Sequence, residues 1–294
     1  MLTVAQVKQY ENDGFIVVHD VFDAEIIQRL RRITDELVKK SCSLTESDKV
    51  YDLAPNHTAE RPRVRRIKTP HLVDPVFQEL TAYPGLVAIL QQLMGPDIRF
   101  DSSKLNLKEA HHGEPVEWHQ DWAFYPHTND DLLAVGLMLD NCELENGPLM
   151  IIPGSHKGPN YNHHDDEGYF CGAMDPSACD IDFSKAVPCV GKAGSISIHH
   201  VRAVHGSAEN TSNSPRRLLL YQMCAADAWP LMGISNLQDY DKKMLVGEST
   251  IQPRLENVPV IMPLPPARNA GSIYANQVAL KNRYFSSSEA TAQM

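Results

Sequence analysis

The pattern of hydrophobic and polar positions predicts helices in the first third of the 294-residue chain. Thr3 followed by Gln6 matches a capping box and predicts a short helix to about Asn12. The apolar, β-branched run 15–18 then predicts a strand. A second helix begins after Asp23, because apolar residues recur there at helical spacing: Ile26, Ile27, Leu30, Ile33, Leu37 and Val38.

Residues 42–62 show no periodicity, and we interpret them as a mobile loop. The segment 75–94 predicts two short helices separated at Pro84, since proline favours the first turn of a helix. Gly95 and Pro96 end the second of them.

From about residue 97 the pattern changes to short apolar runs divided by turn residues. The predicted strands are 98–100, 104–108, 116–121, 132–140, 149–152, 195–199 and 216–224. Such a series predicts an all-β sandwich or barrel, here with flanking helices. The chain has no repeat and no evident linker. We therefore expect one domain over 1–294: a helical part to about 96, a β core over about 97–230, and an irregular covering over about 231–294 that ends in a frayed tail, 286–294.

One long polar loop interrupts the β core. Residues 158–185 are rich in Gly, Pro, Asn, Asp and aromatic residues, and loops of this length inside a domain are usually functional. We interpret the loop as a lid over a substrate pocket. Its candidate aromatic residues, with one from the following segment, are Tyr161, Tyr169, Phe170 and Trp229.

Composition and charge exclude several classes of protein. A net charge of −10 argues against a general binder of nucleic acid or anionic membranes. The six cysteines include no Cys-x-x-Cys pair, so we expect free thiols rather than a zinc ribbon or a disulfide scaffold. The N-terminus shows no signal-peptide pattern, and no uncharged apolar run is long enough to cross a bilayer. The expected location is the cytoplasm, and the expected partner is a small-molecule substrate.

Two residues within a predicted strand carry the candidate chemistry. His119 and Asp121 are two positions apart, so on a strand both side chains project from one face. They would supply two of the three ligands of a 2-His-1-carboxylate triad for non-haem Fe(II), with a distant histidine as the third. The run 163–166 contains the same His-x-Asp spacing, but its polar loop context does not support the alternation argument.

Several motifs accompany this pair in a fixed order. Asn146-Gly147 leads to Pro153-Gly154-Ser155-His156, and Gly194 opens a run ending in His199-His200. His205-Gly206-Ser207 follows, with Arg216 eleven residues after His205. Together with Asp13-Gly14-Phe15 near the start, these motifs resemble the phytanoyl-CoA dioxygenase family of Fe(II)/2-oxoglutarate oxygenases. The resemblance extends from the N-terminus to about Trp229.

The resemblance implies a double-stranded β-helix, or jelly-roll, core of the cupin-like kind. It implies that His119, Asp121 and His205 bind the metal. Arg216 matches the arginine that pairs with the distal carboxylate of 2-oxoglutarate, and Ser207 matches a neighbouring hydroxyl. Arg217, the competing arginine, would face the other side of the strand. Arg66, within the basic cluster 61–68, resembles a basic residue that approaches the cosubstrate or an anionic substrate group.

Two further histidines belong to these motifs. His200 is interpreted either as lining the pocket or as a satisfied buried histidine, and His156 is expected to make a structural hydrogen bond.

The implied activity is hydroxylation of a small molecule with O2 and 2-oxoglutarate, releasing succinate and CO2. Desaturation, epoxidation or rearrangement on the same scaffold are the alternatives within enzymes. A non-catalytic β-barrel binding protein with a structural metal is the alternative outside them. The basic cluster 61–68 slightly favours a substrate with an anionic group.

Overall fold

The computed structural model describes residues 1–262, 266–268 and 272–285. The helices are α1 (Val4–Asp13), α2 (Ala24–Lys40), α3 (Pro75–Glu79), α4 (Pro84–Met94), α5 (Leu237–Asp241) and α6 (Ile273–Asn276). The strands are β1 (Phe15–Val18), β2 (Tyr51–Leu53), β3 (Val64–Lys68), β4 (Ile98–Lys108), β5 (Val116–His119), β6 (Leu132–Met138), β7 (Met150–Ile151), β8 (Val187–Pro188), β9 (Ile196–His200), β10 (His205–Ser207), β11 (Arg216–Ala225) and β12 (Met244–Val246). Short 3₁₀ turns connect many of them.

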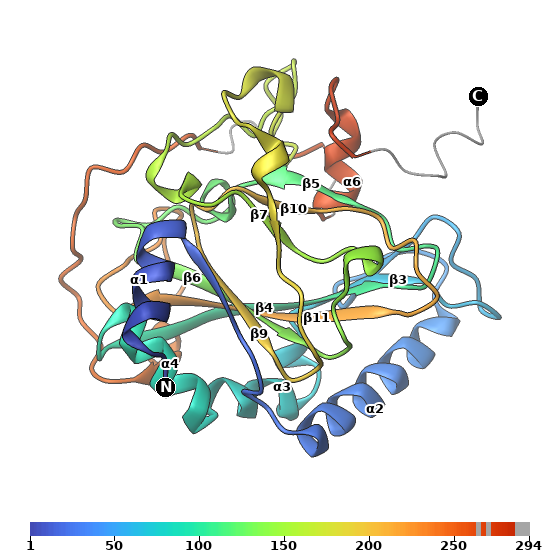
Figure 1. Ribbon diagram of the computed structural model, residues 1–294, viewed down its shortest axis with the longest axis horizontal. Coiled ribbons are helices and arrows are strands. Elements are labelled where there is room, and N and C mark those ends of the chain that lie inside the picture. The colour runs from blue at the N-terminus through green and yellow to red at the C-terminus, as the bar shows by residue number, and fades with distance from the viewer. Residues whose placement is uncertain (263–265, 269–271, 286–294) are drawn as a thin grey trace.

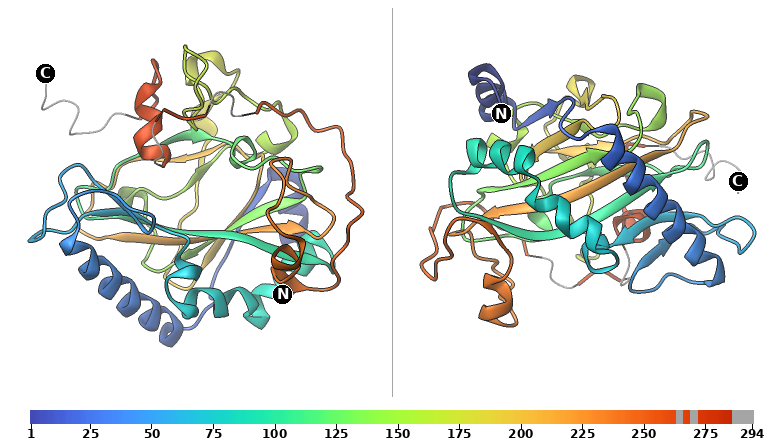
Figure 2. Two further views of the ribbon diagram at one scale, coloured as in Figure 1. Left: turned by 180° about the vertical axis from the view of Figure 1, so that it is seen from behind. Right: turned by 90° about the horizontal axis from the view of Figure 1, so that it is seen from below.

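Two antiparallel sheets face each other and form the jelly-roll core that the sequence predicted. The larger sheet has the order β1-β9-β6-β11-β4-β3-β2, with β12 also paired to β4, and the smaller has the order β5-β10-β7-β8. Helices α2, α3 and α4 cover the outer face of the larger sheet, and the smaller sheet lies over its other face (Figure 1, Figure 2). The helices and the smaller sheet thus lie on opposite faces of the larger sheet, and α6 lines the cavity between the two sheets.

The N-terminal helices begin at the capping residues that the sequence predicts. Thr3 and Gln6 make the predicted capping box. Asp23 accepts a hydrogen bond from the backbone of Ile26 and starts α2. Apolar residues of α2, including Leu30, are buried in a core that also contains helix α4 and the outer face of the larger sheet. Burial of this apolar stripe holds the helix on the sheet.

Two expectations about strands need correction. The two strands predicted over 98–108 are one continuous strand, β4. The segment 42–62, expected as a mobile loop, contains β2, whose residues Tyr51 and Leu53 are buried. The basic cluster 61–68 contributes β3, which pairs with β2 on one side and β4 on the other. These strands depend on partners distant in sequence, which local periodicity does not reveal.

The lid expected over 158–185 is also wrong. This segment is irregular chain with short 3₁₀ turns, and its Met174 packs with Trp118 of β5 and with Val204, which precedes β10. Helix α6, beside β5 in Figure 1, takes the place next to the cavity instead. The expected tail 286–294 lies outside the described residues. Among the described helices, none combines the length and apolar character needed to span a bilayer.

Candidate active site

His119, Asp121 and His205 meet between the two sheets. His119 ends β5 and His205 begins β10, and the two are paired across the smaller sheet. Asp121 opens a 3₁₀ turn, so the strand is shorter than predicted. Gln120 between them is nevertheless extended, with φ −117° and ψ 129°. The alternation therefore continues through Gln120, and Asp121 points to the same side as His119.

The three side chains present a buried set of metal donors. Their ligand atoms all lie within 4.8 Å of one another, and each residue is buried. Nδ1 of His119 lies 2.8 Å from the Glu117 carbonyl, and Nδ1 of His205 lies 2.9 Å from the Ala203 carbonyl. Each Nδ1–H donates to its carbonyl, which leaves the Nε2 lone pairs toward Asp121. This tautomer is the one that a metal ion requires.

The protonation states also suit a divalent cation. Burial lowers the pKa of His119 to about 4. Burial, with His119 and His199 nearby, holds the pKa of His205 well below its usual range. Burial alone would raise the pKa of Asp121, but Lys104 and the neighbouring histidines hold it well below its usual range. Two neutral imidazoles and a carboxylate result, so metal binding displaces no proton from these groups. The donor set therefore fits an iron ion.

The competing His-x-Asp run is a structural feature. Nε2 of His163 accepts a hydrogen bond from the backbone of Gln120 at 2.9 Å, and its Nδ1 lies 2.9 Å from the Tyr161 carbonyl. Both ring nitrogens are thus engaged with backbone. His163 supports the extended conformation of Gln120 between the two candidate ligands, and it is not available as a ligand itself.

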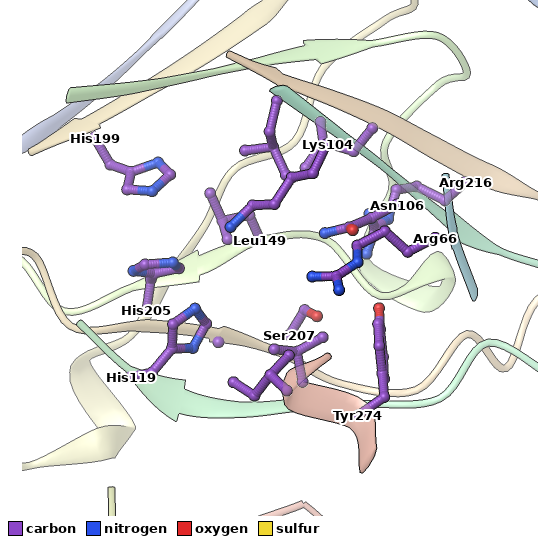
Figure 3. A pocket seen from close by; sticks show the side chains of 15 residues that line it. Arg66, Lys104, Asn106, His119, Leu149, His199, His205, Ser207, Arg216 and Tyr274 are labelled. Atoms are coloured by element: carbon purple, nitrogen blue, oxygen red, sulfur yellow. The ribbon is translucent and has the colours of Figure 1, made fainter. Parts of the chain in front are cut away.

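A cavity extends from the triad toward Arg216 and Ser207 (Figure 3). Arg216 begins β11, is buried, and donates from Nε and Nη2 to the Gly147 carbonyl at 3.1 and 2.7 Å. Ser207 Oγ accepts a hydrogen bond from Nζ of Lys108 at 2.8 Å. Neither Lys108 nor Arg216 has a carboxylate within 4 Å among the residues that the structure describes. Burial and the neighbouring Arg216 hold the pKa of Lys108 well below its usual range, so the charge of this inner cavity rests on Arg216. A buried guanidinium without a carboxylate partner favours an anion in the inner cavity.

Arg66 reaches the same cavity from the neighbouring strand β3. It is paired in register with Asn106 of β4, and both line the inner cavity. The Nε of Arg66 is buried without a hydrogen-bond partner among the described residues. Its nearest carboxylate oxygen belongs to Asp52, at 4.0 Å. Burial lowers the pKa of Arg66. An incoming carboxylate would satisfy this unpaired donor.

The sequence matches the model of the phytanoyl-CoA dioxygenase (PhyH) family over residues 10–218. The chain belongs to the phytanoyl-CoA dioxygenase family. It is 36% identical over 283 residues to a probable alpha-ketoglutarate-dependent hypophosphite dioxygenase of Stutzerimonas stutzeri, covering 95% of this chain and 99% of the relative. It is 26% identical over 231 residues to an ectoine dioxygenase of Bordetella parapertussis, covering 73% of each.

The solved structures confirm the fold. EctD from S. alaskensis with bound Fe superposes with a TM-score of 0.66 at 22% identity, covering 90% of this chain and 89% of that one. The protein is thus an Fe(II)- and 2-oxoglutarate-dependent dioxygenase of the jelly-roll type, as its motifs predicted.

Sequence reasoning missed polar residues of this dioxygenase that lie on one face of β4. Lys104 and Asn106 line the cavity, and Lys108 reaches Ser207 behind it. Their two-residue spacing was visible in the sequence, but it was interpreted only as a strand. Ile273 and Tyr274 of α6 also line the cavity and carried no sequence signal.

Of the two interpretations of His200, the pocket-lining one does not hold, because the neighbouring residue takes that place. His199 lines the cavity, whereas the ring of His200 lies beside His156 with centroids 5.2 Å apart. Nδ1 of His200 accepts a hydrogen bond from the backbone of Arg202 at 3.1 Å, so His200 is a half-buried histidine with a structural hydrogen bond. His156 makes the expected structural contact, with Nε2 at 3.3 Å from the Glu11 carbonyl.

Two cavities border the triad: the inner one described above, and an outer one whose lining includes Phe124. The aromatic residues proposed for a lid line neither of them. Phe170 packs edge-on against Phe124, which does line the outer part of the site, and Trp229 packs on Tyr240. These contacts are packing interactions.

Proposed function

We propose that this dioxygenase hydroxylates a small oxyanion, with iron held by His119, Asp121 and His205. The buried donor set described above supports these three ligands. A 2-His-1-carboxylate set occupies one face of the ion and leaves positions for cosubstrate and O2. Bound Fe(II) would supply O2 activation coupled to decarboxylation of 2-oxoglutarate into succinate and CO2. The remaining steps depend on how the protein orients its two anionic ligands.

The inner cavity suits the distal carboxylate of 2-oxoglutarate. Arg216 uses Nε and Nη2 on a single carbonyl oxygen, and Nη1 has no partner among the described residues. Because Lys108 donates to Ser207 Oγ, the hydroxyl proton of Ser207 is left to donate to another acceptor. Arg66, on strand β3 of the same sheet as Arg216, adds its unpaired Nε. A carboxylate between these groups would gain charge-assisted hydrogen bonds in a desolvated site.

The proposal that the substrate is an anion rests on the residues that line the outer cavity. This cavity of about 300 Å³ borders the triad at His119 and Asp121. Three cationic residues line it (Arg66, Lys68 and Lys104), and so do Thr69, Ser102 and Ser103. Asp121 is its only acidic lining residue within the described part of the chain. A basic hollow inside a protein of net charge −10 attracts and concentrates a small anion.

Lys104 is the residue best placed to hold that anion. Its Nζ lies 3.5 Å from Oδ1 of Asp121 and the side chain lines both cavities, so an anion bound to it would lie beside the metal. Figure 3 shows the Lys104 ammonium directed into the space between the histidines and Arg66. Such a position would hold the bond to be hydroxylated beside the metal ligands.

The names of two relatives also point to a small substrate. The relative with 36% identity is named for hypophosphite, and another for ectoine, which are both small molecules. Desaturation and epoxidation need adjacent carbon centres that a small inorganic oxyanion lacks, so hydroxylation is the preferred reaction. The alternative of a non-catalytic binding protein is less suitable, because a purely structural metal would not need a second, cationic cavity beside its three protein ligands. The six unpaired thiols suit a reducing compartment, and we place the enzyme in the cytoplasm.

The test measures succinate formed from 2-oxoglutarate by the Fe(II)-loaded enzyme with hypophosphite, methylphosphonate, ectoine or proline added. We expect the oxyanions to accelerate succinate formation and the zwitterions to have no effect. Lys104→Met should raise the KM for the oxyanion by about 10- to 100-fold, the effect of one hydrogen bond to a charged group. Lys185→Met, at an exposed lysine outside both cavities, is the matched control. Acceleration by ectoine or proline alone would contradict the oxyanion assignment.

A further inference from the structure

Two buried groups beside the metal site have polar atoms without hydrogen-bond partners. Within the described residues, Oδ2 of Asp121 has no partner, and neither ring nitrogen of His199 has one. These atoms face each other, because Nε2 of His199 lies 3.5 Å from Oδ2 of Asp121. Both residues are at most 1% exposed. An unsatisfied polar group this deeply buried costs about 1–3 kcal/mol, so a pair of them facing each other calls for an explanation.

We propose that His199 is a positioning residue for the metal: its ring N–H donates to Oδ2 of Asp121 and turns Oδ1 toward the ion. The proposal rests on the proposed iron site and adds a residue that was not among the candidate ligands. A shortening of a few tenths of an ångström would make the contact a normal hydrogen bond.

The two oxygens of Asp121 already differ in their surroundings. Oδ1 faces the candidate ligands, at 3.9 Å from Nε2 of His119 and 4.0 Å from Nε2 of His205. Oδ2 faces His199 on the other side. A carboxylate held in this way presents one oxygen to an ion. Bidentate binding, which would occupy a further coordination position, is opposed by the hydrogen bond to Oδ2.

The location of His199 also fixes its ring. It lies on β9 between β1 and β6, paired with Phe15 and Ala134 in those strands. Its ring packs against His205, with centroids 4.4 Å apart. Ala134 leaves room for the imidazole on the inner face of the sheet. His200, the next residue on the strand, points to the opposite face, as the pleat requires.

His199 is better suited to this role than to direct ligation. The triad already provides the three protein ligands of an iron site that must keep positions open for 2-oxoglutarate and O2. A fourth imidazole would occupy one of them. Histidine and carboxylate groups that contact metal ligands commonly orient them, and their loss costs about 10- to 100-fold in metal affinity.

The experiment titrates Fe(II) anaerobically into metal-free enzyme by calorimetry and records the visible spectrum of the Co(II)-substituted protein. His199→Phe keeps a planar ring without a donor, and His199→Gln restores a donor through its amide. His200→Phe is the matched control on the opposite face of β9. Circular dichroism and thermal unfolding establish that each variant is folded, and His199→Leu replaces His199→Phe should the larger ring disturb the core.

We expect His199→Phe to bind Fe(II) about 10- to 100-fold more weakly and to change the Co(II) spectrum. His199→Gln should recover most of the affinity, which a merely space-filling role would not produce. His200→Phe should match the wild type. Wild-type affinity and spectrum in folded His199→Phe would overturn the role of His199 while leaving the iron site intact. Failure of the wild-type protein to bind Fe(II) would overturn the iron site and this inference together.

Discussion

Arg216 and Arg217 are consecutive residues of β11 whose guanidinium groups lie on opposite faces of the larger sheet. Arg216 donates to the Gly147 carbonyl at the wall of the inner cavity. Arg217 donates to Asp140 from Nε and Nη2, each at 2.8 Å, and pairs with Asp35 of helix α2 at 2.6 Å. The pleat of one strand thus separates an arginine that lines the inner cavity from one that makes structural ion pairs.

Replacing Arg216 should weaken binding of 2-oxoglutarate. Arg216→Met removes the buried guanidinium whose Nη1 would donate to the distal carboxylate, and the expected increase in KM for 2-oxoglutarate is about 10- to 100-fold. Succinate formation at varied 2-oxoglutarate concentration measures it. Arg217→Met is the control, because it should lower the unfolding temperature through loss of its ion pairs and leave that KM unchanged. An equal rise in KM in both variants would contradict the separation of roles.

The candidate metal ligands should be needed for turnover. Asp121→Ala removes the carboxylate of the triad, and we expect no measurable succinate formation and a large loss of Fe(II) affinity. Chelation of the wild-type enzyme should stop turnover, and added Fe(II) should restore it. Asp166→Ala, in the other His-x-Asp run, should retain wild-type activity. Wild-type succinate formation by Asp121→Ala would rule out the assigned site.

Tyr274 provides a prediction about the part of the site that comes from the C-terminal region. Its hydroxyl points toward Arg66 and Asn106 (Figure 3), and burial raises the pKa of Tyr274 to about 12. The phenol therefore remains a protonated donor at neutral pH. We expect Tyr274→Phe to raise the KM for 2-oxoglutarate by about 2- to 10-fold, the effect of one neutral hydrogen bond. Tyr284→Phe, at a half-exposed tyrosine packed on Trp118, should leave it unchanged. Identical kinetics in the two variants would argue against contact between Tyr274 and the cosubstrate.

A site residue could be predicted from the sequence where the pattern that marks it lies within a few neighbouring residues. His119 and Asp121 are two residues apart on extended chain, so alternation alone predicted their shared direction. His205 could be chosen only through the ordered motifs of the family, because β10 is three residues long and exists through pairing with β5 and β7.

Tyr274 was not predictable, because α6 is positioned by contacts distant in the chain. The side chain of Gln277 accepts a hydrogen bond from the backbone of Glu117, 160 residues earlier. Further along the chain, the backbone N–H groups of Tyr284 and Phe285 donate to the carboxylate of Glu117. No periodicity within a four-residue helix encodes such a docking.

Acid should destabilise the metal-free protein through His163. Burial lowers the pKa of His163 to about 3, since its neutral ring accepts the hydrogen bond from Gln120 and avoids a buried charge. The unfolded chain binds a proton on this histidine below about pH 6.5, whereas the folded protein does so only near the lowered value. The unfolded state therefore binds more protons between these values, and the stability present above about pH 6.5 is lost as the pH falls.

The size of this loss of stability follows from the difference between the pKa values of His163 in the folded and unfolded states. Between about pH 7 and about pH 5 the loss from His163 is about 2 kcal/mol in the free energy of unfolding. Urea unfolding of the chelator-treated protein at both pH values measures it. His163→Gln keeps an oxygen that can accept the hydrogen bond from Gln120 and cannot titrate, so its unfolding free energy should fall less on acidification, by about that amount. Parallel pH dependence in the wild type and the variant would show that His163 is not the group responsible. The loss would then arise at other histidines such as His200, whose pKa desolvation lowers to about 4.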